Sequence, residues 1–503
     1  MMMNLTIDPW IPALRDDGRR DLFSLQDLFA QAHELRDLAV KPHERIALMR
    51  LLLCITQAAL DGPADEDSWE QCRPLIQTRV RAYLDKWRGS FELFGDGPRF
   101  LQLPNLQPGK ESDEGNAATK LDLTLATGNN STLFDNLAGN KRSIRAARAA
   151  VNLITFQNFS ACGRIGIAKW SGKDTPGKGS SNHAPCTSSS MVHTFILGSC
   201  LLDTLFLNLL NKETITENLT GGWGKPIWEH PITDFTGESA KNAGMTYLGR
   251  FVPLSRAIRL DDQGFSIILA NGLEYPVFPA FRETSATIIK RKEGLGLLSA
   301  STSRNLWRQL SAITVKRRAG VENGAGPLAL VNLSEPREDI TVWVGALIAA
   351  GNGKLVDVIE STYSLPPGMF SESAEFGRAG YEKGVAFAES YDEPSKGILM
   401  QAVKAYASSL KMAAPAYDRA RQFFWTRVEQ HLSSLIDLAR NTNLAADLPN
   451  CAWGKAVQAA AYAAFEQSCP RQTPRQIQAY AHGLRRLNFR PKVNQPTTNT
   501  AHE

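Results

Sequence analysis

The stretch Ile340–Thr362, which reads ITVWVGALIAAGNGKLVDVIEST, carries the clearest structural pattern in the chain. Two runs rich in β-branched residues flank Asn352-Gly353, the dipeptide that most readily places both central residues of a two-residue turn at positive φ. The pattern therefore predicts a β-hairpin. Its tip carries Ala349, Ala350, Gly351, Asn352, Gly353 and Lys354.

The composition of this tip permits two interpretations. Small residues, one amide and one cation at the end of a stiff ribbon would form a wedge, because no bulky side chain prevents the tip from entering a nucleic-acid groove. An ordinary surface hairpin would carry the same residues, since Asn-Gly turns are common in β-proteins of every function. Taken alone, the stretch favours the ordinary hairpin.

Length and charge set broad limits on the fold and its partners. A chain of 503 residues is too long for one typical core, so we expect several domains. The formal net charge of +5 and an isoelectric point near 8.7 are only mildly basic. Any contact with nucleic acid must then come from local clusters of cations and not from a global field.

Cysteine and histidine usage argues against disulfides and metal sites. The seven cysteines are scattered and never occur as C-x-x-C, which indicates reduced thiols in a cytoplasmic protein. His183, Cys186 and His193 lie close in sequence but lack a fourth ligand in any recognised pattern, so we expect no metal. The start of the chain and its most apolar stretch, Phe195–Leu210, predict neither a signal peptide nor a membrane span.

A change in composition after Pro366-Pro367-Gly368 predicts the domain organisation. Residues 1–367 mix strand and helix signals with irregular loops, whereas residues 368–490 contain Ala-rich segments of helical periodicity and almost no strand signal. We expect an α+β protein with a large mixed N-terminal domain that carries the hairpin, followed by a C-terminal bundle of four main helices. The polar tail, residues 491–503, is expected to be disordered.

Four further segments are candidates for contact with nucleic acid. Residues 126–135 form a polar, turn-forming segment that ends in Leu133 and Phe134, which either anchor the loop in the core or leave the aromatic ring free to stack. A predicted helix, residues 141–156, gathers three cations on one face, which is either solvated or follows a phosphate backbone. These cations are Lys141, Arg145 and Arg148.

The other two segments combine glycines or strand signals with cations. Gly163 and Gly166 flank Arg164 in a loop whose backbone can approach a ligand closely. The trio Lys290-Arg291-Lys292 follows a strand signal and serves either solubility or phosphate contact.

The search for catalytic chemistry is mostly negative. Gly172–Ser180 almost spells a phosphate-binding P-loop, but Gly179 follows Lys178 where Ser or Thr should ligate magnesium. The next segment is too rich in Ser, Pro and Asn to form the helix that must receive the phosphates. We therefore predict no enzyme activity and no cofactor, with a nucleotide-binding enzyme at Gly172–Ser180 as the less favoured alternative.

The order of several motifs along nearly the whole chain resembles the large-subunit (CasA) family of the type I-E CRISPR surveillance complex, called Cascade. Each motif is short, and their shared order carries the resemblance. The matching features are Leu5–Pro12, Gly128–Asp135, Thr155–Gly163, Lys225–Glu229, and a hairpin followed by a helical bundle.

The resemblance implies a non-catalytic DNA-recognition subunit. In that family the large subunit reads a short motif beside the target, the protospacer-adjacent motif (PAM), from the minor-groove side. It also wedges the strands apart so that guide RNA begins to pair and an R-loop forms. Specificity along the length of the target comes from base pairing with the guide RNA. The implied partners are the backbone, small and guide-RNA-end subunits of Cascade, the CRISPR RNA, double-stranded target DNA, and a helicase-nuclease effector.

The resemblance also implies roles for residues of this sequence. The PAM loop falls on Gly163, Arg164 and Gly166, and the cations that bind the DNA backbone fall on Lys290, Arg291 and Lys292. The loop at the guide-RNA end falls on Asn130, Leu133, Phe134 and Asp135. The strand wedge falls on Ala350, Gly351, Asn352, Gly353 and Lys354. The family's wedge commonly carries glutamine and this tip has none, so Asn352 would take its place. A scaffold subunit that never touches DNA is the alternative.

Overall fold

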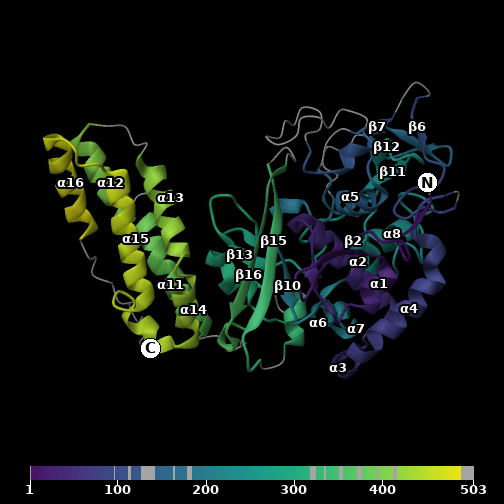
Figure 1. The fold of residues 1–503 in the computed structure, drawn as a ribbon, viewed down its shortest axis with the longest axis horizontal. Coiled ribbons are helices and arrows are strands. Elements are labelled where there is room, and N and C mark those ends of the chain that lie inside the picture. The colour runs from purple at the N-terminus through teal and green to yellow at the C-terminus, as the bar shows by residue number, and fades with distance from the viewer. Residues whose placement is uncertain are drawn as a thin grey trace, which may run out of the picture. The chain divides into compact units, whose positions relative to one another are not determined.

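The chain forms two units in the computed structural model, Met1–Leu365 and Pro366–Glu503. The first contains helices and strands and the second contains helices (Figure 1). The border falls between residues 365 and 366, beside the predicted border at residue 367. The structure describes residues 2–95, 97–110, 115–125, 142–161, 165–177, 184–317, 324–333, 336–350, 355–370, 377–393, 396–411 and 416–488.

Helix α2, Pro42–Leu60, forms the centre of the first unit, and its residues from His43 to Gln57 are buried. Proline suits the first helical position, and the Glu44 carboxylate accepts a hydrogen bond from the backbone N–H of Lys41 at 3.1 Å, which fixes the start of the helix. Strands β15 and β16 and helices α4, α5, α6 and α9 pack against α2. The other α-helices of this unit are α1 (Leu25–Ala30), α3 (Glu66–Cys72), α4 (Ile76–Trp87), α5 (Ala146–Phe159), α6 (Leu201–Leu207), α7 (Lys212–Asn218), α8 (Glu238–Met245), α9 (Tyr247–Phe251) and α10 (Leu310–Ile313).

Small antiparallel sheets surround this helical centre. Their orders within the described residues are β3-β2-β4, β1-β5, β6-β8-β9, β11-β12-β7, β13-β14 and β10-β15-β16. The strands are β1 (Met3–Asn4), β2 (Ile11–Arg15), β3 (Arg20–Phe23), β4 (Leu35–Leu38), β5 (Glu92–Phe94), β6 (Gln107–Pro108), β7 (Asn116–Ala117), β8 (Ala168–Trp170), β9 (Lys173–Asp174), β10 (His193–Leu197), β11 (Arg256–Leu260), β12 (Ser266–Asn271), β13 (Ile288–Arg291), β14 (Gly294–Leu297), β15 (Ile340–Ala349) and β16 (Leu355–Leu365). Helices combined with separate antiparallel sheets confirm the predicted α+β class.

The predicted hairpin is confirmed and consists of β15 and β16. Every pair from Ile340 opposite Leu365 to Ile348 opposite Asp357 is equidistant in sequence from Asn352-Gly353. This is the register that a two-residue turn at that dipeptide would set. The ladder shifts once, at its last pair, where Ala349 lies opposite Leu355. The turn dipeptide itself lies outside the described residues.

A single tryptophan joins the hairpin to the core. Trp343 of β15 is 2% exposed, stacks on Phe195 of β10 with ring centroids 5.8 Å apart, and lies under the guanidinium of Arg45 on α2. Its indole N–H donates to the Glu360 carboxylate on β16 at 2.7 Å. Gly345 makes room for the ring, because a Cβ at that position would lie 2.2 Å from it. The base of the hairpin is therefore packed on both sides of β15.

The second unit is the predicted helical bundle. Within residues 377–488 its α-helices are α11 (Gly377–Asp392), α12 (Ile398–Ser409), α13 (Ala416–Glu429), α14 (Leu432–Arg440), α15 (Ala452–Ser468) and α16 (Pro474–Leu487). Helical periodicity in the sequence predicts one segment over about Tyr417–Ala439, where the structure has α13 and α14. The bundle therefore contains more helices than the predicted four. Glycines allow close packing: a Cβ on Gly380 would lie 2.3 Å from the Leu438 carbonyl oxygen, and the Trp453 indole donates to the Gly384 carbonyl at 2.8 Å. The predicted tail, residues 491–503, lies outside the described residues.

None of the helices in the described ranges has the length and apolar character that crossing a membrane requires.

Candidate nucleic-acid interface

A serine holds the end of the hairpin from the side. The Ser190 hydroxyl accepts a hydrogen bond from the backbone N–H of Ala349 at 3.0 Å and lies 3.4 Å from the carbonyl oxygen of the same residue, to which it donates. Pairing of β15 with β10 ends at Gly345, opposite His193. Ser190 therefore takes the place of a strand partner four residues farther along β15. Ala350, the last tip residue that the structure describes after β15, is exposed.

The backbone around this serine is unusual. Ser189 and Ser190 have φ of 55° and 50°, a region that residues with a Cβ rarely adopt. The Ser190 carbonyl also accepts a hydrogen bond from the N–H of Ala300 at 2.9 Å, three residues after the end of β14. Sequence reasoning treated Ser180–Ser190 only as too polar for a helix and missed this role, because a contact between residues 159 apart leaves no local signal.

The three predicted backbone-binding cations lie at the end of the β13–β14 hairpin. Lys290 pairs with Leu295 and Arg291 with Gly294, which leaves Lys292 in the turn, and all three cations are exposed. The Arg291 guanidinium folds back on its own hairpin, where it donates to the Leu297 carbonyl at 2.7 Å. A Cβ on Gly296 would lie 2.4 Å from Arg291 Nε, so this glycine makes room for the side chain. Arg291 thus stabilises the hairpin that presents the two lysines.

Gly166, from the predicted PAM loop, borders a cleft of about 300 Å³. Gly163 and Arg164 lie outside the described residues. Two other glycines shape the cleft by allowing backbones to approach closely: a Cβ on Gly109 would lie 2.2 Å from the Ile167 carbonyl oxygen, and one on Gly115 would lie 2.9 Å from the Ile267 carbonyl oxygen. Backbone atoms therefore form part of the walls.

One cation lines this cleft. The ammonium of Lys120 donates to the Asn116 side-chain oxygen at 2.9 Å, and partial burial lowers the pKa of Lys120 below its usual value. Among the described residues that line the cleft there is no aspartate or glutamate. Sequence reasoning missed Lys120, because a lone lysine in a Gly- and Pro-containing stretch matches no motif.

The four residues predicted for the guide-RNA-end loop, Asn130, Leu133, Phe134 and Asp135, lie outside the described residues. A cluster of charges holds the chain on either side of that segment. Arg148 of α5 forms ion pairs with Glu44 and with Asp122, where its Nη2 lies 3.2 Å from a carboxylate oxygen. The Lys41 ammonium donates to the Thr124 hydroxyl at 3.0 Å.

This cluster changes the interpretation of the predicted cationic stripe. Helix α5 begins at Ala146, so Arg145 precedes it, and Lys141 lies outside the described residues. Burial raises the pKa of Asp122, but hydrogen bonds from Thr124 and the charges of Lys41 and Arg148 outweigh burial and leave that pKa below its usual value. Arg148 therefore pairs with acids of its own chain, which neither alternative for the stripe, a solvated face or a face along a phosphate backbone, had included.

The near-match to a P-loop forms a hairpin over its described part. Strands β8 and β9 pair antiparallel, and Ser171 and Gly172 between them both have positive φ, at 50° and 77°. These values suit a tight turn between strands. A phosphate-binding loop instead requires a strand, a glycine-rich loop and then a helix N-terminus. Residues 178–183, including Lys178, lie outside the described residues.

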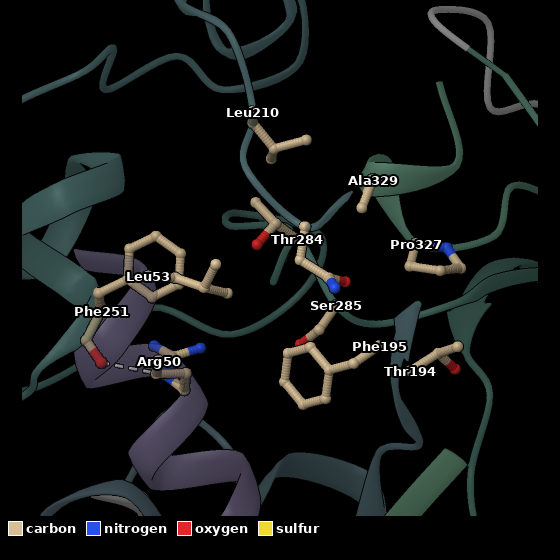
Figure 2. Close-up of a pocket in the computed structure, with 11 residues that line it drawn as sticks. Arg50, Leu53, Thr194, Phe195, Leu210, Phe251, Thr284, Ser285, Pro327 and Ala329 are labelled. Carbon is tan, nitrogen blue, oxygen red and sulfur yellow. Dashed lines mark hydrogen bonds between the residues drawn. The ribbon is translucent and has the colours of Figure 1, made fainter. Parts of the chain in front are cut away.

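The buried charges of the first unit form a structural cluster. The Glu283 carboxylate accepts from Arg50 at 2.6 Å and from Arg250 at 2.5 Å. Burial raises the pKa of Glu283, but the two guanidinium groups outweigh burial and hold that pKa at about 2. Figure 2 shows Arg50 beside a cavity, with its hydrogen bond to the Phe251 carbonyl, which is 3.0 Å long. The cavity volume is about 20 Å³, room for about one water molecule and far too small for a nucleotide.

The predicted near-neighbours Cys186 and His193 are both buried, and His183 lies outside the described residues. The His193 Nδ1 atom lies 2.8 Å from the Ser285 hydroxyl, and burial lowers the pKa of His193 to about 4. Burial also raises the pKa of the Cys186 thiol to about 12. Across the described ranges, no three histidine, cysteine or acidic residues are grouped as metal ligands would be.

Comparison with known proteins gives the family. Residues 4–464 match the family model of the CRISPR-associated protein Cse1. The CRISPR-associated protein CasA/Cse1 of Thermus thermophilus is 30% identical over 422 residues, which cover 80% of this chain and 78% of that protein.

Solved structures share the fold. The crystal structure of Thermus thermophilus CasA has a TM-score of 0.74 at 21% identity, covering 97% of this chain and 98% of that one. Cse1 from Acidimicrobium ferrooxidans has a TM-score of 0.74 at 22% identity and covers 97% of both chains. A chain of a CRISPR RNA-guided surveillance complex also has a TM-score of 0.74, at 17% identity, covering 97% of this chain and 99% of that one. The protein therefore belongs to the CRISPR-associated protein Cse1 (CasA) family.

Proposed function

We propose that this chain is the non-catalytic large subunit of a type I-E RNA-guided DNA surveillance complex, which reads a PAM in duplex DNA and starts strand separation. Family membership supports the role as a subunit, and one structural neighbour is a chain of a CRISPR RNA-guided surveillance complex. The partners are the other Cascade subunits, CRISPR RNA, target DNA and the helicase-nuclease effector, and the site of action is the cytoplasm.

The hairpin is the observation that carries the proposal. Its central strand is buried and fixed by Trp343, while Ala350 at its end is exposed and small. Separating stacked base pairs costs about 1.4 kcal/mol per step, so a wedge must be rigid at its base and slim at its tip. The β15–β16 ribbon meets both conditions, and Asn352 and Lys354 supply an amide and a cation at the tip.

The rest of the first unit contributes contacts with the duplex and the guide. Lys290 and Lys292 bind DNA phosphates, and the loop of Gly163, Arg164 and Gly166 approaches the minor groove. That groove offers a degenerate pattern of acceptors, which suits a reader that tolerates several motifs. The loop of Asn130, Leu133, Phe134 and Asp135 binds the end of the guide RNA, and the helical bundle contacts other subunits.

The experiment is a binding titration of the complex assembled with guide RNA against duplexes randomised beside the target. Salt is held fixed, because phosphate contacts alone can change affinity by orders of magnitude. The proposal predicts a motif preference that depends on this subunit. A complex that binds without any motif preference would contradict the proposal and would indicate that the chain is a scaffold subunit.

A further inference from the structure

The chain from Ala184 to Ser190 begins against the C-terminal end of α5. The N–H of Ala184 donates to the Ser160 carbonyl at 3.2 Å, and the N–H of Cys186 donates to the Asn158 carbonyl at 3.1 Å. Asn158 and Ser160 are buried, and hydrogen bonds in the interior are stronger than those exposed to water. In the sequence, the loop proposed to read the PAM starts three residues after Ser160.

The same segment ends at the hairpin. The Ser190 hydroxyl bonds to both the N–H and the carbonyl of Ala349, the last residue of β15. The segment therefore contacts the helix end that leads into the proposed PAM loop and also the strand end that leads into the proposed wedge. Residues 184–190 thus form a brace between these two elements.

Short-range hydrogen bonds stiffen the brace. The N–H of Thr187 donates to the Ala184 carbonyl and the N–H of Ser190 donates to the Thr187 carbonyl, both at 3.2 Å. Ala184, Cys186 and Thr187 are at most 4% exposed, and the N–H of Ala300 fixes the Ser190 carbonyl at 2.9 Å. The brace keeps its two ends at a constant separation, because buried, hydrogen-bonded backbone is costly to rearrange.

We infer that Ser190 is a positioning residue that sets the place of the hairpin tip relative to the proposed PAM loop. A duplex whose motif is bound by the loop then has the tip at the adjacent base pair, so the strands open where the motif is read. The inference rests on the proposed function, because it requires a loop that reads the motif and a tip that separates the strands. Ser190 acts through Ala349 and needs no contact with DNA.

The test separates opening from binding. Complexes assembled with guide RNA are mixed with saturating duplex that carries either a preferred or a disfavoured motif, and the fluorescence of a base analogue beside the motif reports the rate of opening. The quantity compared is the ratio of the two rates. Ser190→Ala removes both hydrogen bonds to Ala349, so we expect the ratio to fall about fivefold, the factor that one hydrogen bond of ordinary strength supplies.

A role confined to stiffening the hairpin would give a different result. Ser190→Ala would then slow opening by the same factor on both motifs, and the unchanged ratio would overturn the inference. The matched control is Ser361→Ala, which removes a hydroxyl of β16 that donates to the neighbouring Glu360 carbonyl at 2.8 Å and should keep the native ratio. An equal fall in this control would also overturn the inference. The guide-RNA content of each complex checks its assembly.

A duplex with a mismatch beside the preferred motif provides a second measurement. Its first pair is already open, so the tip has no pair to separate there, and Ser190→Ala should form the R-loop at the native rate. A slower rate would place the defect at a later step and would overturn the inference.

Failure of the proposed function is recognised separately. Equilibrium binding by the native complex without motif preference overturns the proposed function, irrespective of the ratio of opening rates. A native complex that shows the preference, together with an unchanged ratio for Ser190→Ala, overturns the inference alone.

Discussion

The Ser190 hydroxyl lies 3.0 Å from the backbone nitrogen of Ala349, although the two residues are 159 positions apart. Ala349 is the last residue of β15, and the ladder of the hairpin shifts register there. Strand β10 stops pairing with β15 before this point, so Ser190 supplies lateral hydrogen bonds at the end of the strand. A wedge that separates base pairs needs this support, because force on the tip would otherwise bend the two strands together.

Replacing this serine should weaken strand opening more than it weakens folding. Ser190→Ala removes both hydrogen bonds to Ala349 and should cost about 1 kcal/mol of stability. We expect the assembled complex to open duplex DNA more slowly, as measured by the fluorescence of a base analogue placed beside the PAM. Ser361→Ala is the control, because that hydroxyl on β16 donates to the neighbouring Glu360 carbonyl at 2.8 Å. Equal rates of opening by the Ser190→Ala variant and the native protein would show that Ser190 does not support strand opening.

The sequence predicts the hairpin and the border between units because both depend on local chemistry. The described pairs from Ile340–Leu365 to Ile348–Asp357 have the register expected for a turn at Asn352-Gly353, and Pro366-Pro367-Gly368 marks the change in composition. Features that depend on distant partners could not be predicted. Arg148 has the spacing of a surface cation, yet Glu44, 104 positions away, pairs with it.

The cleft beside Gly166 is another feature that depends on residues distant in the sequence. Gly166 was predicted from its loop, but the cleft beside it depends on Gly109 and on Lys120, which arrive from another part of the sequence. The positive φ of Ser189 and Ser190 was also not predictable, since serine has no preference for that region.

The buried cluster around Glu283 should dominate the stability of the first unit. Glu283→Gln leaves Arg50 and Arg250 buried without their shared anion and should cost roughly 3–5 kcal/mol. Chemical denaturation gives the free energy of unfolding. The control, Glu238→Gln, breaks an exposed pair and should leave the unfolding midpoint unchanged. Both arginines also donate to backbone carbonyls, Arg50 to that of Phe251 and Arg250 to that of Gly244. A loss below about 1 kcal/mol for Glu283→Gln would show that such carbonyls alone are enough to hold the two guanidinium groups.

Two buried histidines should make the protein less stable in mild acid. Burial lowers the pKa of His43 and His193 from 6.5 to about 4, so the unfolded chain binds more protons than the folded chain between these values. The stability that depends on these neutral histidines is therefore fully present above pH 6.5, and it is lost as the pH falls toward 4. At pH 5 the loss should be about 2 kcal/mol for each histidine.

The histidine prediction is tested by measuring the free energy of unfolding at pH 7.5 and pH 5. His193→Asn can keep a polar contact with Ser285 while it removes the imidazole, so its decrease between the two pH values should be about 2 kcal/mol smaller than that of the native protein. Equal decreases would mean that His193 does not bind an extra proton on unfolding.

The two units should fold separately. Residues 1–365 and 366–503 each have their own internal packing, with Trp343 buried in the first and Trp453 in the second. We expect both fragments to be soluble and to unfold cooperatively when produced alone, as judged by size-exclusion chromatography and thermal unfolding. Aggregation of both fragments would argue against the border.

The central claim is that the tip of the β15–β16 hairpin opens the duplex. The most direct measurement compares strand opening at the PAM by complexes assembled with native protein and with the double variant Asn352→Ala, Lys354→Ala. The account predicts normal assembly and guide-RNA content but slower and less complete opening by the variant. Assembled variant complexes that open the duplex as the native complex does would contradict it.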